Sequence, residues 1–208
     1  MIDAPLTCPD GLVFDDVEHE YKLDGAVVPS VSRLTHVVAP DLYAGIAEDI
    51  MQRAAERGHN KHLMIALDVR DKLDHGALSD DMLEDWCAWD TFREHTKFEV
   101  EHSERCLASR KHKYAGTLDL AGTLVYKGSR DRWIIDAKFT ALLPSLVDIQ
   151  LAGYKQAAVE SLPGYDEKTR RGCLWIRNGK YKFHESTNRM DMSALIAART
   201  ILHRRESL

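Results

Sequence analysis

The sequence predicts a mixed α/β fold of the α+β kind, in which helices flank a central mixed β-sheet. Three apolar segments of strand length lie within residues 98–138, and segments with helical spacing precede and follow them. Asn178-Gly179 separates two further strand-like segments, and this dipeptide is a strong signal for a tight β-hairpin. We therefore expect a sheet of hairpins that is extended by a strand after a helix.

Length and composition indicate an ordinary globular chain. With 208 residues, of which 44% are hydrophobic and 29% charged, we expect one domain. It divides into an N-terminal hairpin and helix (11–40), a core (about 41–177) and a C-terminal hairpin and helix (178–208). No apolar run approaches the roughly 20 residues that span a membrane, so we expect a cytoplasmic protein without membrane contact. The four cysteines show no Cys-x-x-Cys spacing, which argues against zinc, an iron–sulfur cluster and a disulfide framework.

The N-terminal segment reads as a hairpin followed by a short helix. Asp24-Gly25 supplies a turn within residues 11–28, and Ser30 is the expected N-cap of a helix that stops at Pro40. A helix N-terminus with hydroxyls and a guanidinium can bind a phosphate, which makes Ser30, Ser32 and Arg33 candidate substrate-binding residues. Simple capping is the alternative interpretation.

Two helices are expected before the central strands. The first covers residues 41–73, with an apolar face formed by Ile46, Ile50, Ala54, Ile65 and Val69. Gly58 lies in its interior, where glycine costs about 1 kcal/mol relative to alanine, so we expect a close approach by another backbone or a ligand. The second helix starts after Ser79 and carries an aromatic stripe, including Trp86 and Trp89, which indicates core or subunit interface.

The strands and the helix after them carry the polar residues of interest. The strand expected over residues 98–107 carries Glu104, and Asp119 lies on the strand 114–124 among small neighbours. Asp136 and Lys138 must project to the same side of the third strand, because strand side chains alternate. A helix follows, capped by Ser145, and it presents Gln150 and Tyr154 four residues apart on one face.

The C-terminal region completes the sheet and adds a helix. Strands are expected over 172–177 and 181–184, on either side of Asn178-Gly179. A final helix over about 192–204 should bury Leu195, Ile196 and Ile201.

Three of these patterns, taken in order, resemble the motifs of the PD-(D/E)XK nuclease superfamily. They are Gly116-Thr117-Leu118-Asp119, Asp136-Ala137-Lys138 and Gln150-x-x-x-Tyr154. The resemblance is to the branch that contains RecB-type nuclease domains, phage alkaline exonucleases of the λ type and mitochondrial genome maintenance exonucleases. It covers about Leu12 to Trp175 and implies a restriction-endonuclease-like core with the order αβββαβ.

The resemblance also implies a metal site. Gly58-x-x-x-His62 is similar to the Gly-x-x-x-His motif of RecB-type nucleases, which makes His62 a ligand, with His59 as the alternative register. The other implied ligands are Asp119, Asp136 and the carbonyl of Ala137. Such a donor set suits Mg²⁺, with Mn²⁺ able to substitute.

The remaining catalytic candidates have supporting roles. Glu104 stands where relatives carry a glutamate, and it is expected to bind a second metal, to bind metal through water or to pair with a lysine. Lys138 would act on the attacking water or on the phosphate. Gln150 and Tyr154 would position Lys138 or the DNA backbone, with helix-to-sheet packing as the other role for Tyr154.

The resemblance therefore predicts a metal-dependent DNA exonuclease. The specific expectation is 5′→3′ digestion of duplex ends in phage or prophage recombination, by a homotrimer that works with a single-strand-annealing recombination protein. A single-strand exonuclease, a structure-specific endonuclease and a catalytically silent DNA-binding or assembly module are the alternatives. The net charge of −5 speaks against a nucleic-acid partner, but bound cations reverse the local sign, and basic patches such as Lys168 with Arg170 and Arg171 remain.

Overall fold

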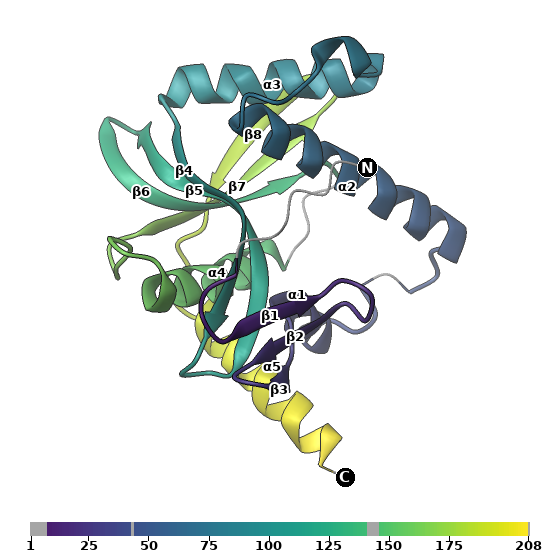
Figure 1. The fold of residues 1–208 in the computed structure, drawn as a ribbon, viewed down its shortest axis with the longest axis vertical. Coiled ribbons are helices and arrows are strands. Elements are labelled where there is room, and N and C mark those ends of the chain that lie inside the picture. Colours follow the sequence, from purple (N-terminus) through teal and green to yellow (C-terminus); the bar gives the residue numbers. More distant parts are fainter. Residues whose placement is uncertain (1–7, 43, 141–145, 208) are drawn as a thin grey trace.

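The computed structural model describes residues 8–42, 44–140 and 146–207. Its centre is a strongly twisted five-stranded sheet, with α2 and α3 packed on one face and α4 on the other (Figure 1). A small three-stranded sheet lies beside it, and α5 extends away toward the C-terminus. The expected α+β fold, with helices around a central mixed sheet, is thus confirmed.

The large sheet has the spatial order β4-β5-β6-β7-β8. Its strands are β4 (Glu99–Ser109), β5 (Tyr114–Tyr126), β6 (Ser129–Lys138), β7 (Arg170–Arg177) and β8 (Lys180–Glu185). All neighbours are antiparallel except β6 and β7, which are parallel because α4 (Val147–Ser161) connects them. Two helices, α2 and α3, precede the three strands β4 to β6, which are followed by α4 and β7, so the order is the expected αβββαβ with one additional helix before the strands. Ser145, the expected cap of α4, lies outside the described residues.

Alternation along β6 divides the core into two layers. Ile134 is buried with the residues of α4, whereas its neighbours Trp133 and Ile135 are buried against α2 and α3.

The tight turn between β7 and β8 is formed by Asn178 and Gly179, whose φ angles are 50° and 66°. The predicted hairpin is confirmed.

The N-terminal region folds as expected. β1 (Leu12–Asp15), β2 (Glu20–Leu23) and β3 (Ala26–Val28) form the antiparallel small sheet, and α1 (Val31–Val38) follows. The Ser30 hydroxyl accepts a hydrogen bond from the Arg33 amide at 3.0 Å, so Ser30 is the N-cap. The expectation of capping is confirmed.

The first long helix is shorter than predicted. α2 spans Glu48–Val69, and its buried residues are confined to its last two turns, around Ile65. Its first half projects from the body of the molecule (Figure 1), which leaves Ile46 and Ile50 about half exposed and Ala54 exposed. Helical spacing correctly indicated a helix, but tertiary packing covers only its C-terminal end. The expected close approach of another backbone at Gly58 was wrong, because a Cβ added there would meet no atom of the described residues within 4 Å, while approach by a ligand stays a prediction.

The aromatic stripe lies in the core. α3 (Asp80–Thr96) follows the short 3-10 helix η1 (His75–Ala77), and Trp89 is fully buried. The indole groups of Trp86 and Trp89 each donate to the Asp68 carboxylate at 2.8 Å, which ties α3 to α2. Trp89 is therefore unavailable as a subunit contact.

The C-terminal helix α5 (Asp191–Glu206) packs against α1 and α4. Leu195 is buried as predicted, but Ile196 and Ile201 are 38% and 46% exposed, because only one stripe of the helix faces its neighbours. Among the described residues, no helix is both long enough and apolar enough to cross a membrane.

Candidate metal centre

The motifs that contain Asp119 and Asp136 meet where β5 and β6 separate. The ladder between these strands runs from Tyr126 and Ser129 down to Leu120 and Ile135, and the next residues are Asp119 and Asp136. Beyond the ladder, the Ala137 amide donates to Asp119 Oδ2 at 2.8 Å. Because the two strands no longer pair at this point, the Ala137 amide is free to bind and orient the Asp119 carboxylate.

His62 and Glu104 complete a cluster with Asp119. His62 Nδ1 lies 3.5 Å from Asp119 Oδ2 and 3.9 Å from Glu104 Oε1, and one donor atom from each of the three residues lies within 4.8 Å of the others. These side chains come from α2, β4 and β5. All three are partly exposed, so solvent and solutes can reach the cluster. His59 is exposed and outside the cluster, which favours His62 as the relevant register.

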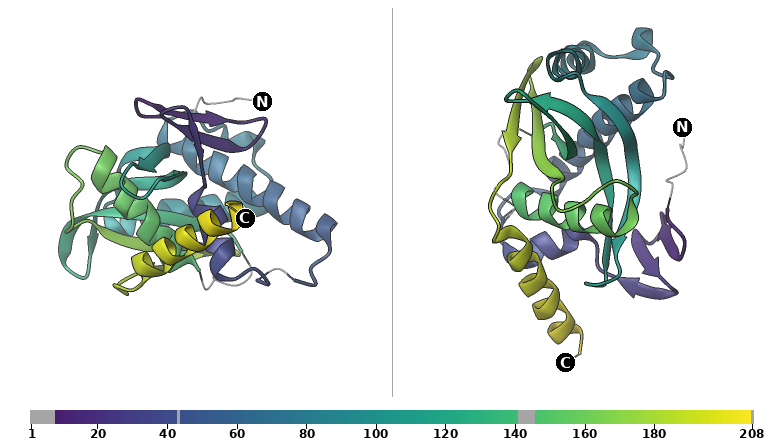
Figure 2. Two further views of the ribbon diagram at one scale, coloured as in Figure 1. Left: turned by 90° about the horizontal axis from the view of Figure 1, so that it is seen from below. Right: turned by 90° about the vertical axis from the view of Figure 1, so that its left-hand side faces the viewer.

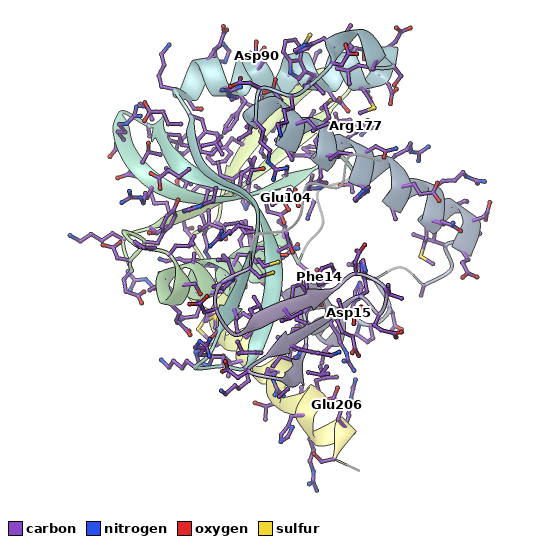
Figure 3. The ribbon with its side chains drawn as sticks, viewed as in Figure 1. Phe14, Asp15, Asp90, Glu104, Arg177 and Glu206 are labelled. Atoms are coloured by element: carbon purple, nitrogen blue, oxygen red, sulfur yellow. The ribbon has the colours of Figure 1, made fainter. Side chains whose placement is uncertain are left out.

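Glu104 has an unusual backbone conformation. Its φ is 48° in the middle of β4, although non-glycine residues rarely adopt positive φ inside a strand. Its neighbours Ser103 and Arg105 pair with Leu120 and Leu118, so this irregularity occurs directly opposite Asp119. Figure 3 shows Glu104 near the centre of the molecule, between α2 and the β1–β2 hairpin. The sequence marked Glu104 only as a supporting residue, whereas the structure makes it a full member of the cluster.

Asp136 is directed differently from the other acids. One of its oxygens lies 2.7 Å from Lys138 Nζ, which confirms that the two side chains share one side of β6. Asp136 is only 1% exposed, and apart from this ion pair its oxygens have no hydrogen-bond partner among the described residues. The structure therefore leaves Asp136 beside the cluster rather than in it. The Ala137 contribution shown is its amide, and a role for its carbonyl stays a prediction.

Burial and charge repulsion shift the pKa values of the acidic residues upward. Burial, with added repulsion from Asp119, raises the pKa of Glu104 to about 8. Burial raises the pKa of Asp119 and of Asp136 to about 6 each. The surroundings of these three carboxylates therefore compensate their negative charge poorly.

The two basic groups respond in opposite directions. Burial and the positive charge of Lys138 lower the pKa of His62 to about 4, so its imidazole is neutral at physiological pH. Burial would lower the pKa of Lys138, but the carboxylates of Asp136 and Asp119 outweigh it and raise the pKa above its usual value. Lys138 is therefore charged at neutral pH.

This donor set fits a divalent cation. A neutral imidazole and two nearby carboxylates can coordinate a hard metal, and the under-compensated negative charge favours a cation at this point. The oxygens of the buried Asp136 carboxylate also lack hydrogen-bond partners, and a nearby cation would compensate their charge as well. Carboxylate oxygens outnumber nitrogen donors and no thiolate is present in the cluster, which suits Mg²⁺ or Mn²⁺ better than a soft metal.

Gln150 and Tyr154 support the cluster from α4. Gln150 Nε2 donates to the Tyr154 hydroxyl at 3.2 Å, and burial together with Asp119 and Asp136 raises the pKa of Tyr154. The ring packs on β5, since a Cβ at Gly116 would lie 2.9 Å from Tyr154 Cε1. Tyr154 therefore has a packing role as well as a position beside the acids.

The candidate phosphate-binding residues lie apart from the cluster. Ser30 pairs with Ala115 in an isolated bridge, four residues before Asp119 on the same chain segment. Its hydroxyl caps α1, while Arg33 forms an ion pair with Glu206 of α5 at 2.8 Å. Ser32 is exposed. The structure does not join Ser30, Ser32 and Arg33 to the metal centre, and their substrate role stays a prediction.

Two nearby residues were missed from sequence. The Phe139 ring lies edge-on to the His62 imidazole, with 5.5 Å between the ring centroids, and helps to orient it. The charge of Arg70, at the end of α2, partly offsets the rise in the Glu104 pKa. Both residues could have been suspected from their positions in the sequence. Phe139 directly follows the Asp-x-Lys motif, and Arg70 lies eight residues after His62 on a similar helical face.

No family model matches the chain, and no curated protein matches it. Among solved structures it is similar to one titled "Crystal structure of SSO0001", with a TM-score of 0.35 and 12% sequence identity. The similarity covers 83% of this chain and 75% of that chain. A likeness this weak transfers neither fold nor function, so the function has to be inferred from the residues themselves.

Proposed function

We propose that this protein is a metal-dependent DNA nuclease that hydrolyses phosphodiester bonds, with Mg²⁺ as its cofactor. One observation carries the proposal, namely the cluster of His62, Glu104 and Asp119 beside the Asp136–Lys138 ion pair. The cluster contains two of the ligands expected from the PD-(D/E)XK-like motifs, His62 and Asp119, with Asp136 beside it, and we propose membership of that superfamily on the same basis. Fold likeness alone would not support an activity.

In this proposal His62, Glu104 and Asp119 hold the metal, with Asp136 next to them. The bound cation supplies an activated water and offsets the charge that develops on the phosphate. The Ala137 amide keeps Asp119 Oδ2 oriented through its 2.8 Å hydrogen bond. The neutral imidazole of His62 offers a nitrogen lone pair without requiring the loss of a proton at neutral pH.

Lys138 acts as a fixed positive charge. Its raised pKa keeps the ammonium protonated, so it donates hydrogen bonds to a phosphate oxygen or to the attacking water and does not serve as a general base. Its side chain is 19% exposed while its partner Asp136 is almost fully buried, so Asp136 holds the ammonium at the edge of the site. Tyr154 and Gln150 limit the movement of this region from the α4 side.

The finer proposal is end-directed 5′→3′ digestion of duplex DNA in phage or prophage recombination, by a homotrimer with a single-strand-annealing partner. Its support is the motif resemblance. Because Trp89 is fully buried, contacts between subunits have to use other residues.

The test compares linear and closed-circular DNA. Purified protein is incubated with end-labelled linear duplex and with covalently closed circles, in Mg²⁺ and in EDTA, alongside Asp119→Asn and the exposed control Asp16→Asn. We expect Mg²⁺-dependent loss of linear DNA, intact circles, a drop of about 10³-fold or more in Asp119→Asn and none in Asp16→Asn. Efficient cutting of circles would replace the exonuclease with an endonuclease. No cleavage of any DNA in Mg²⁺ or Mn²⁺ would refute the nuclease proposal.

A further inference from the structure

A second site lies away from the metal centre. A half-open cavity of about 450 Å³ is lined by α4, the start of β7, the end of β8 and the chain that enters α5. Its volume is within the range of about 300–1,000 Å³ that is typical of small-molecule sites. None of the residues assigned to the metal centre lines it. Figure 2 shows α4 lying next to the start of α5, and both pack together.

The cavity wall has an excess of positive charge. Arg170 is already paired with Glu185 and Asp131, and Arg171 with Asp191. Among the described residues, three further lining cations form no ion pair, namely Lys155, Lys168 and Arg189. Glu167 is the lining carboxylate that is left outside an ion pair. Three unpaired cations therefore face one unpaired carboxylate, which favours an anionic ligand.

Lys155 is the most constrained of these cations. It is partly buried on α4, and burial lowers its pKa. Its ammonium donates to the Glu167 carbonyl at 2.8 Å, which is a neutral acceptor. A lysine ammonium can donate several hydrogen bonds, so Lys155 has donors left for an anion in the cavity.

Two buried hydroxyls lie in the same wall. Ser186 is 5% exposed, and its Oγ has no hydrogen-bond partner among the described residues. Because this oxygen is itself buried, it lies behind the cavity surface and forms part of the wall without facing the cavity. Thr169 is 3% exposed, and its Oγ1 accepts from the Asp166 amide at 3.0 Å, which leaves the hydroxyl proton for another acceptor.

The wall is held in place by Arg171. Its guanidinium donates to the Asp148 carbonyl on α4, to the Asn188 carbonyl before α5 and to the Asp191 carboxylate within α5. These bonds connect three of the elements that surround the cavity. The site is therefore pre-formed, so a ligand need not order it first.

We propose that this cavity binds a phosphate-bearing anion of about mononucleotide size, with Lys155 as its principal donor. At about 30 Å³ per water, the cavity corresponds to about fifteen waters, which is more than a phosphate group alone requires. The phosphate can belong to a free mononucleotide or to a DNA strand. The proposal does not rest on nuclease activity, since binding here uses none of the residues of the metal centre.

The test is isothermal titration calorimetry in EDTA, where no divalent metal is present. The ligands are inorganic phosphate, dAMP, deoxyadenosine and a short oligonucleotide without terminal phosphates. The variants are Lys155→Met and the control Lys180→Met, which removes the charge of an exposed lysine outside the cavity.

We expect dAMP to bind the wild-type protein and deoxyadenosine not to bind. Lys155→Met should weaken dAMP binding by about tenfold or more, and Lys180→Met should leave it unchanged.

The oligonucleotide distinguishes the two sources of phosphate. If it binds through Lys155 while dAMP does not, the ligand is a DNA strand. If dAMP binds and the oligonucleotide shows no dependence on Lys155, the ligand is a free mononucleotide. Absence of Lys155-dependent binding by both dAMP and the oligonucleotide would overturn the proposal, as would equal weakening in Lys180→Met.

Discussion

Raising the pH from 6.5 to 8 should destabilise the metal-free protein through Glu104. The pKa of Glu104 is about 8 in the folded protein and ordinarily 4.5, so near pH 6.5 the folded state holds a proton that the unfolded chain has released. When the pKa of a group is higher in the folded state than in the unfolded state, its contribution to stability is fully present below the unfolded-state pKa. This contribution is lost as the pH rises through the folded-state pKa. Stability must therefore fall in this window.

The window isolates one residue of the cluster. Asp119 and Asp136, with pKa values of about 6, are largely ionised above pH 6.5 in both states. Folded His62 is neutral throughout the window, because its pKa is lowered to about 4. The unfolded imidazole, with its ordinary pKa of 6.5, loses its remaining protons between pH 6.5 and 8, which opposes the Glu104 effect by only about 0.4 kcal/mol. One proton is worth about 1.4 kcal/mol per pH unit, so the free energy of unfolding should fall by about 1.5–2 kcal/mol between pH 6.5 and 8.

The assay is urea unfolding in EDTA at several pH values across the window. Glu104→Gln should remove the decline, whereas the exposed control Glu18→Gln should retain it. Saturating Mg²⁺ should flatten the decline and stabilise the protein most at pH 8, because a ligand that binds only the folded state adds to its stability. A free energy of unfolding that is constant or rises from pH 6.5 to 8 in EDTA would refute the electrostatic description of Glu104.

Three further substitutions test the site. Lys138→Ala should lose about 10³-fold in DNA cleavage while keeping Mg²⁺ affinity by calorimetry, because the ammonium is not a ligand, and lost affinity would make it structural. His62→Ala should weaken Mg²⁺ binding about tenfold or more in the same calorimetry, and an equal effect in His59→Ala would show that the register is wrong. Gly116→Ala should lower the free energy of unfolding by about 1–3 kcal/mol in urea, because its Cβ would lie 2.9 Å from Tyr154 Cε1, and unchanged stability would contradict that contact.

The sequence by itself determined the features that depend on near neighbours in the chain. Strand alternation placed Asp136 and Lys138 on one side, and they form an ion pair. Ser30 was recognised as an N-cap and Asn178-Gly179 as a hairpin turn, because capping and positive φ are properties of short segments. The motif spacing also directed attention to His62 and Asp119, which the fold brings within 3.5 Å.

Only the tertiary structure decided how these parts combine. The sequence did not show that Glu104 adopts a left-handed conformation opposite Asp119, or that Asp136 lies beside the cluster and not within it. It also overestimated the buried face of α2, since helical periodicity cannot tell which turns another element will cover. Burial, pKa and close approach depend on atoms distant in sequence, and they are fixed only when all the layers have packed.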